Sequence, residues 1–152
     1  RFITPKGTYT MKIMAVDYGE SRTGIAISDV TEFLASPVCI IKEKNTLKAI
    51  DKICEKAAEL NAEMIVIGNP VNMDGTRGER SEKCTFVAEE VAKKVNIPVN
   101  MWDERATTKT ALNMLSDNGT FGKKRKEVLD AVAATVILEN FMAYRKNHRD
   151  EQ

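Results

Sequence analysis

The stretch AVDYGESRTG, residues 15–24, sets the expectation for the fold. An apolar run ends on Asp17, turns through glycine, and becomes apolar again in GIAIS, residues 24–28. Short apolar runs on either side of a glycine-containing turn are typical of two antiparallel strands. We therefore predict a β-hairpin with Asp17 at the end of its first strand and Arg22 within its turn.

The rest of the chain alternates predicted strands with predicted helices. Continuous apolar runs bounded by turn residues indicate strands, and apolar residues spaced three or four apart indicate helices, of which Ser81 is expected to cap one. These patterns predict strands over 36–42, 63–70 and 97–102, and helices over 46–61, 81–95, from Thr107 or Thr108 to Gly119, and over about 127–145. Together with the hairpin they imply an α/β fold. Its mixed five-stranded sheet is antiparallel at one edge, where three strands lie, and parallel beyond, with helices on both faces.

Length and composition indicate one globular domain. The chain has 152 residues, of which 43% are hydrophobic and 30% charged, and no apolar run is long enough to cross a bilayer. We expect residues 1–10 to be a leader or remnant outside the fold, residues 11–145 to form the domain, and residues 146–152 to be a polar tail. Three cysteines lie far apart without a C-x-x-C pair, which favours thiols packed in or near the core of a cytoplasmic protein: Cys39, Cys54 and Cys84.

Several catalytic motifs are missing from the sequence. The only histidine is His148, in the polar tail, and no G-x-S-x-G elbow occurs, which argues against a Ser–His or Cys–His nucleophile. Neither a P-loop nor a G-x-G-x-x-G after a strand is present. Carboxylates remain as the candidate catalytic groups.

Four acidic residues end or interrupt predicted apolar elements. Asp17 ends the first strand, Asp103 and Glu104 follow the strand over 97–102, and Asp130 interrupts the apolar start of the last helix. Buried carboxylates are normally paired, hydrogen-bonded or bound to metal, because an unpaired charge is costly to bury. If the strand ends lie side by side and the last helix crosses them, these acids converge. Such a cluster suits Mg²⁺ or Mn²⁺, which can activate water for phosphodiester cleavage.

Each acid also has a local structural interpretation. Asp17 could organise the turn that follows it, and Asp103 or Glu104 could cap the next helix. Asp130 is expected in the first turn of its helix, where the helix dipole favours acids. The joint occurrence of the acids is what favours a site.

Any binding of nucleic acid would depend on a local basic patch, because the net charge is only +1. The stretch KKRK, residues 123–126, which we expect to be a loop, supplies such a patch, although a solvated charge run is an equal alternative. Arginines in loops or near strand ends could add to it: Arg22, Arg77, Arg80 and Arg105.

Four motifs in consistent order make the sequence resemble the YqgF family. This family of the ribonuclease H-like superfamily comprises Holliday-junction-resolvase-like proteins that are also described as nucleases for pre-16S rRNA. The resemblance runs from about Met11 to about Tyr144, over DYGESRTGIAISD, IVIGNPVNMDGTRG, DERATTKTA and KKRKEVLDAVAATVIL. It implies a single ribonuclease H-like domain and hydrolysis of phosphodiester bonds that depends on Mg²⁺ or Mn²⁺.

The resemblance also implies site residues. The acids would be Asp17, Asp103 or Glu104, and Asp130, with Asp17, Glu104 and Asp130 as metal ligands; the choice between Asp103 and Glu104 stays open. The strand over 63–70 carries Asn69 rather than an acid near its end. Phosphate contacts would come from basic residues of the family-like motifs, since guanidinium matches phosphate geometry: Arg22, Arg77, Arg105, Lys123, Lys124 and Arg125.

Other functions remain open at this point. An aspartate and glycine in the first hairpin also begin actin-like and sugar-kinase ATPases, although one lobe of this length lacks the opposing half. A non-catalytic RNA-binding ribosome-assembly factor is a further alternative, but clustered acids would repel the phosphates that it must bind. As a nuclease, the chain would need one site for 5′-end processing of pre-16S rRNA, which we prefer. Symmetric cutting of a four-way DNA junction would call for a homodimer.

Overall fold

The predicted hairpin forms the middle of a five-stranded sheet. The computed structural model describes residues 2–3, 9–32, 34–69, 78–103 and 122–149, with side chains for residues 11–32, 34–69, 78–103 and 132–146. The strand order in the sheet is β5-β4-β3-β6-β7. The strands are β3 (Ile13–Asp17), β4 (Arg22–Ser28), β5 (Ala35–Lys42), β6 (Met64–Asn69) and β7 (Val99–Asp103). Strands β3, β4 and β5 are antiparallel neighbours, whereas β6 is parallel to both β3 and β7. The mixed sheet predicted from the sequence is confirmed.

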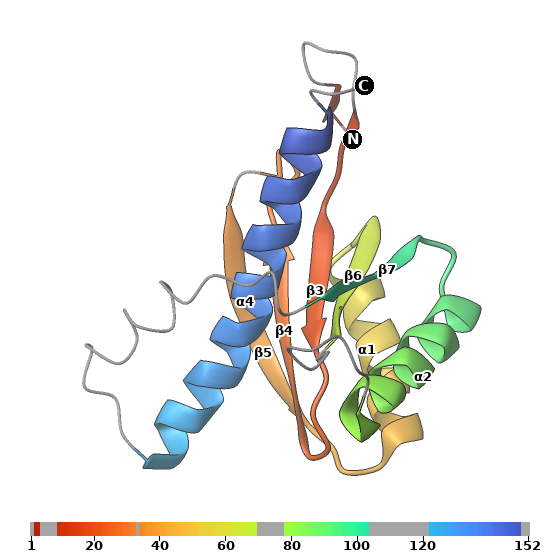
Figure 1. The fold of residues 1–152 in the computed structure, drawn as a ribbon, viewed down its shortest axis with the longest axis vertical. Helices are drawn as coiled ribbons and strands as arrows, with labels where there is room; N and C mark the ends of the chain where they lie inside the picture. Colours follow the sequence, from red (N-terminus) through yellow and green to blue (C-terminus); the bar gives the residue numbers. More distant parts are fainter. Residues whose placement is uncertain (1, 4–8, 33, 70–77, 104–121, 150–152) are drawn as a thin grey trace.

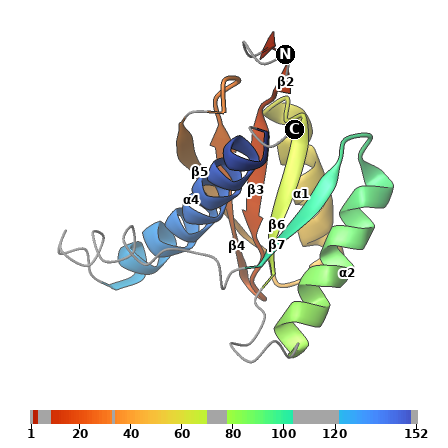
Figure 2. The same cartoon turned by 45° about the horizontal axis from the view of Figure 1, so that its top comes forward.

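Helices cover both faces of this sheet, as predicted. Figures 1 and 2 show α1 (Thr46–Glu59) and α2 (Glu79–Lys94) on one face and α4 (Gly122–Arg149) across the other. Two further short strands, β1 (Phe2–Ile3) and β2 (Tyr9–Thr10), pair only with each other. No helix in the described part of the chain is long and apolar enough to cross a membrane.

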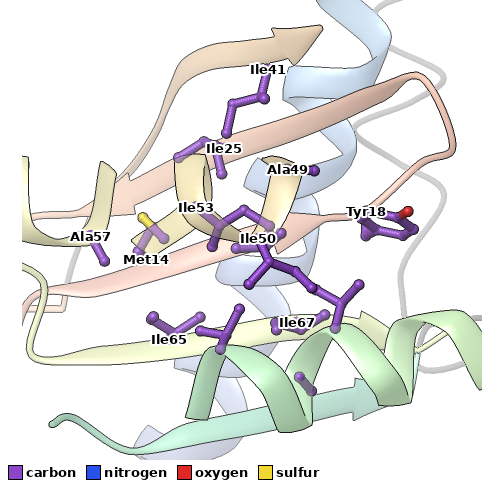
Figure 3. Packing of buried hydrophobic residues seen from close by; sticks show 14 of the residues in the cluster. Met14, Tyr18, Ile25, Ile41, Ala49, Ile50, Ile53, Ala57, Ile65 and Ile67 are labelled. Atoms are coloured by element: carbon purple, nitrogen blue, oxygen red, sulfur yellow. The ribbon is translucent and has the colours of Figure 1, made fainter. Parts of the chain in front are cut away.

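The period-two pattern of β3 divides the core into two layers. Met14 and Val16 pack with α1 and α2, whereas Ile13 and Ala15 pack with α4. Figure 3 shows the first layer, in which Ile50 of α1 lies over the sheet beside its other apolar residues. A strand buried on both faces explains why this run is apolar without alternation.

Three local expectations about the helices are wrong. Gly78, not Ser81, is the N-cap of α2, and Ser81 is buried inside the first turn. The basic stretch 123–126 lies in the first turns of α4 rather than in a loop, because that helix already begins at Gly122. Asp130 therefore lies about two turns into α4 instead of in its first turn. The helix expected to end at Gly119 lies outside the described residues.

The cysteines are free thiols that belong to the core or its margin, as expected. Cys84 is buried, and Cys39 and Cys54 are half-buried against the α1–α2 layer. Burial raises the pKa of both the Cys39 and the Cys54 thiol above the ordinary value. Their thiolate fractions at neutral pH are correspondingly small.

Candidate active site

Asp17 is a nearly buried carboxylate at the end of the central strand. Only 9% of the residue is exposed, and Arg80 Nη2 lies 3.3 Å from Asp17 Oδ1. The same guanidinium nitrogen donates to the Tyr18 carbonyl oxygen, also at 3.3 Å. Arg80 is in the first turn of α2, which begins beside the β3–β4 hairpin (Figure 1). The contact therefore links the end of β3 to the start of a helix that covers the sheet.

The turn after Asp17 is close-packed. Tyr18 is buried with the α1–α2 layer (Figure 3). Its hydroxyl lies 3.0 Å from Thr46 Oγ1. A Cβ on Gly19 would lie 2.4 Å from the Arg22 carbonyl oxygen, so only glycine fits there. These contacts fix the backbone that follows Asp17.

The ends of β6 and β7 lie at the same edge of the sheet as Asp17. The parallel registers pair Val16 with Ile67 and Asn69 with Asp103. Asn69 accepts a hydrogen bond of 2.6 Å from Ser81 Oγ. The only polar side chain at the end of β6 is thus tied to α2, and its amide oxygen has a structural role.

Strand alternation separates the two acids whose side chains are described. Asp17 follows the α4-facing positions Ile13 and Ala15, so it belongs to the α4 face. On β7, Met101 packs with the α1–α2 layer and Trp102 packs with the α4 layer. Asp103 follows the alternation of Met101 and therefore belongs to the opposite face from Asp17. These two carboxylates share an edge of the sheet but not a face.

Arg22 belongs to the same face as Asp17. It is two positions from Gly24, the β4 residue paired with Asp17, and has the parity of Ala26, which packs with α4. Arg22 Nη1 is buried and has no hydrogen-bond partner among the residues that the structure describes. A buried guanidinium nitrogen without an acceptor is costly, so it is suited to an anionic ligand.

Trp102 is part of the core on this face. Its ring forms edge contacts with Phe141 and Tyr144 of α4, with centroids 5.9 and 5.6 Å apart. These contacts anchor the end of β7 against α4, the helix that carries Asp130. Trp102 is therefore a packing residue of the α4 layer.

The remaining predicted site residues lie partly or wholly outside the described residues. Asp130 and the basic residues 123–126 lie in α4, but their side chains are not described, and Arg77, Glu104 and Arg105 lie outside. Within the described side chains, no three His, Cys, Asp or Glu residues are close enough to hold a metal ion. Arg80 was expected only as part of a basic patch, and Ser81 only as a helix cap. Their contacts with Asp17 and Asn69 were not predicted, since these partners are remote in sequence.

A match to a known family identifies the family of this chain. A family model described as "RuvX: Holliday junction resolvase" matches residues 11–144. The chain belongs to this family. A relative from Clostridium acetobutylicum, named "Putative pre-16S rRNA nuclease", is 38% identical over 132 residues, which are 87% of this chain and 98% of the relative. A relative of the same name from Thermoanaerobacter pseudethanolicus is 36% identical over 138 residues, 90% of this chain and 99% of its own.

Solved structures with a similar fold include resolvases. RuvC of T. thermophilus, in complex with a Holliday junction substrate, superposes with a TM-score of 0.59 at 13% identity and covers 90% of this chain and 96% of its own. The Fowlpox virus resolvase, solved with Holliday junction DNA, has a TM-score of 0.50 at 14% identity, covering 90% and 98%. The ribonuclease H-like fold and the predicted family of nucleases are both confirmed, whereas the matching family is not one of actin-like ATPases.

Proposed function

We propose that this RuvX-family chain is a metal-dependent nuclease for structured nucleic acid, with 5′-end processing of pre-16S rRNA as its preferred reaction. The proposal rests on two groups that belong to the same face of the sheet. One is the nearly buried Asp17 carboxylate, and the other is the buried Arg22 Nη1, which has no hydrogen-bond partner among the described residues. One group suits a cation and the other a phosphate. The names of the relatives support an rRNA substrate, whose processing would place the chain in the cytoplasm.

The donor set suits a hard divalent cation. Asp17, Glu104 and Asp130 would hold Mg²⁺ or Mn²⁺, since Asp17 ends the central strand and α4, which carries Asp130, packs on the same face. When bound, such ions supply Lewis acidity toward an attacking water and a leaving oxygen. The protein supplies a fixed strand end, with Gly19 and Arg80 holding the backbone and carboxylate of Asp17 in place.

The face to which Asp103 belongs favours Glu104 as the second acid. Asp103 has the parity of Met101, which packs on the α1–α2 side, whereas Asp17 belongs to the α4 side. The long side chain of Arg80 reaches Asp17 from α2, but a short carboxylate side chain that shares an ion with Asp17 is better placed on the α4 side. Glu104 is the neighbouring candidate, and Asp103 would then have a structural role.

Phosphate contacts would be made by the basic residues of the same region. Arg22 is the best supported of these, because its buried Nη1 lacks an acceptor. Further contacts are proposed for residues whose side chains are not described: Arg77, Arg105, Lys123, Lys124 and Arg125.

Cutting of a branched DNA junction is the second candidate reaction. It is favoured by the family's description and by the fold shared with two resolvases that were solved with junction DNA. Because a symmetric cut requires two sites, this reaction would need a homodimer.

A cleavage assay on matched substrates tests these proposals. Labelled single-stranded RNA, a pre-16S rRNA fragment and a four-way DNA junction are incubated with wild type, Asp17→Asn, Glu104→Gln and Asp103→Asn, in Mg²⁺, Mn²⁺ or EDTA. We expect Asp17→Asn and Glu104→Gln to lower the cleavage rate at least about 100-fold, and Asp103→Asn to lower it less than about tenfold. Circular dichroism and thermal melting establish that each variant is folded.

The possible results separate the alternatives. Cleavage that persists in EDTA or in Asp17→Asn would exclude the proposed chemistry. Binding of RNA without cleavage by the wild type would instead support the non-catalytic assembly factor. Loss of folding in Asp17→Asn would indicate that Asp17 chiefly organises the hairpin turn.

A further inference from the structure

Arg80 is a cationic residue in contact with the Asp17 carboxylate. Its side chain is 57% exposed, whereas the side chain of Asp17 is 11% exposed. The guanidinium therefore reaches a nearly buried carboxylate from the solvent side. A positive charge in this position offsets the cost of keeping Asp17 ionised at the end of β3.

The geometry of this ion pair is that of a replaceable contact. One nitrogen, Nη2, serves both Asp17 Oδ1 and the Tyr18 carbonyl oxygen, at 3.3 Å each. Tight charge-assisted pairs of guanidinium and carboxylate are shorter, at about 2.7–2.9 Å, and often use two parallel hydrogen bonds. A long contact through one shared nitrogen on an exposed side chain contributes little free energy, so another cation can replace it at small cost.

We propose that Arg80 is a positioning residue that holds Asp17 in the metal-free protein and is displaced when a divalent cation takes the Oδ1 oxygen. The inference rests on the proposed function, because it requires Asp17 to be a metal ligand. A guanidinium and a divalent cation cannot share one carboxylate oxygen without strong repulsion. Arg80 thus lowers the affinity of the site for metal while it stabilises the empty site.

The proposal predicts that removal of Arg80 strengthens metal binding. The test is a titration of Mn²⁺ into protein without nucleic acid at pH 7.5, with free Mn²⁺ measured by electron paramagnetic resonance. We expect Arg80→Ala to bind Mn²⁺ about tenfold more tightly than wild type, and Arg80→Lys to bind within about threefold of it. A merely structural role for Arg80 would give the opposite result, because a disordered site binds metal more weakly.

Lys83→Ala is the matched control. Lys83 is on the same helix and pairs with the exposed Glu20 at 3.3 Å, so its removal deletes the same charge without touching Asp17. We expect its Mn²⁺ affinity to stay within about twofold of wild type. Equal tightening in Lys83→Ala and Arg80→Ala would overturn the proposal, since net charge alone would then explain the effect.

Asp17→Asn distinguishes failure of this inference from failure of the proposed function. If Asp17→Asn leaves Mn²⁺ binding unchanged, the metal is not at Asp17 and both proposals fail. If Asp17→Asn abolishes binding while Arg80→Ala leaves it unchanged or weaker, only the role of Arg80 is overturned. Should Arg80→Ala not fold, Arg80→Gln keeps a donor for the Tyr18 carbonyl and is expected to show the same tightening.

Discussion

The turn after Asp17 has no room for a side chain at Gly19. An added Cβ would lie 2.4 Å from the Arg22 carbonyl oxygen, a backbone atom that cannot move without opening the hairpin. We expect Gly19→Ala to lower the free energy of unfolding by about 2 kcal/mol, as overpacking does in a close-packed region. Urea unfolding followed by circular dichroism measures this loss.

Gly78→Ala is the control for this substitution. Nothing lies within 4 Å of a Cβ at Gly78, and its φ of −95° is open to any residue. Gly78 is the N-cap of α2, so alanine there should cost less than about 1 kcal/mol. If both variants lost the same free energy of unfolding, the close approach of a Cβ at residue 19 to the Arg22 carbonyl oxygen would not be destabilising.

Single residues were predictable from the sequence where the signal was local. Asp17 was predicted at a strand end because an apolar run stops there before a glycine, and the structure places it there. Ser81 resembled a cap because it precedes an apolar stripe, yet its hydroxyl donates to Asn69 at the end of β6. The Arg80–Asp17 contact joins residues 63 positions apart, and no spacing rule reveals such a pair.

At the scale of elements, α4 is fastened to the sheet by a buried ion pair. Arg145 Nε lies 2.6 Å from Glu32 Oε1, and the Glu32 side chain is only 1% exposed. Glu32 Oε2 also accepts from the Met11 backbone N–H at 3.1 Å. The turn between β4 and β5, the start of β3 and the end of α4 therefore meet at one carboxylate.

Breaking this pair should destabilise the protein. We expect Arg145→Ala to lower the free energy of unfolding by about 3 kcal/mol, because it leaves a buried carboxylate without this cation. Arg145→Met combined with Glu32→Gln removes both charges and should recover part of the loss. Urea unfolding curves of the single and double variants measure both effects.

An exposed ion pair between α1 and α2 provides the comparison. Lys94 and Asp51 lie 3.3 Å apart with side chains 48% and 59% exposed, so Lys94→Ala should change stability by less than about 0.5 kcal/mol. A loss in Arg145→Ala as small as that in Lys94→Ala would contradict a structural role for the Glu32 pair.

Element types were more predictable than element limits. The short apolar run of β3 and the helical spacing of α1 gave the correct elements, because β3 is buried on both faces and α1 on one. The start of α4 was missed because a run of lysine and arginine indicates exposure, which we interpreted as a loop. Both residues are good helix formers, so an exposed helical turn satisfies the same composition.

At the scale of the whole molecule, charge is arranged locally rather than globally. The net charge is +1, while residues 123–126 place four consecutive basic residues in the first turns of α4. Figures 1 and 2 both show this end of α4, in light blue, extending beyond the sheet. A nucleic acid bound where β3 ends at Asp17 could therefore also contact the start of α4.

Replacing Lys123, Lys124, Arg125 and Lys126 with glutamine should weaken nucleic-acid binding and flatten its salt dependence. Each lost phosphate contact reduces the slope of log K against log salt by about 0.7 to 0.9, so loss of the three contacts proposed for Lys123, Lys124 and Arg125 predicts a reduction of about 2 to 3. Fluorescence anisotropy with labelled pre-16S rRNA fragment and four-way junction, in EDTA, measures binding without cleavage.

A second variant with the same change in net charge decides whether the effect is local. Glutamine at four lysines of α1 and α2 removes as much charge from the other face of the sheet: Lys52, Lys83, Lys93 and Lys94. If the basic start of α4 contacts phosphate, this control keeps most of the wild-type slope, because fewer counterions are released only when contacts are lost. Equal flattening in both variants would mean that the nucleic acid responds to net charge, and that residues 123–126 are a solvated helix end.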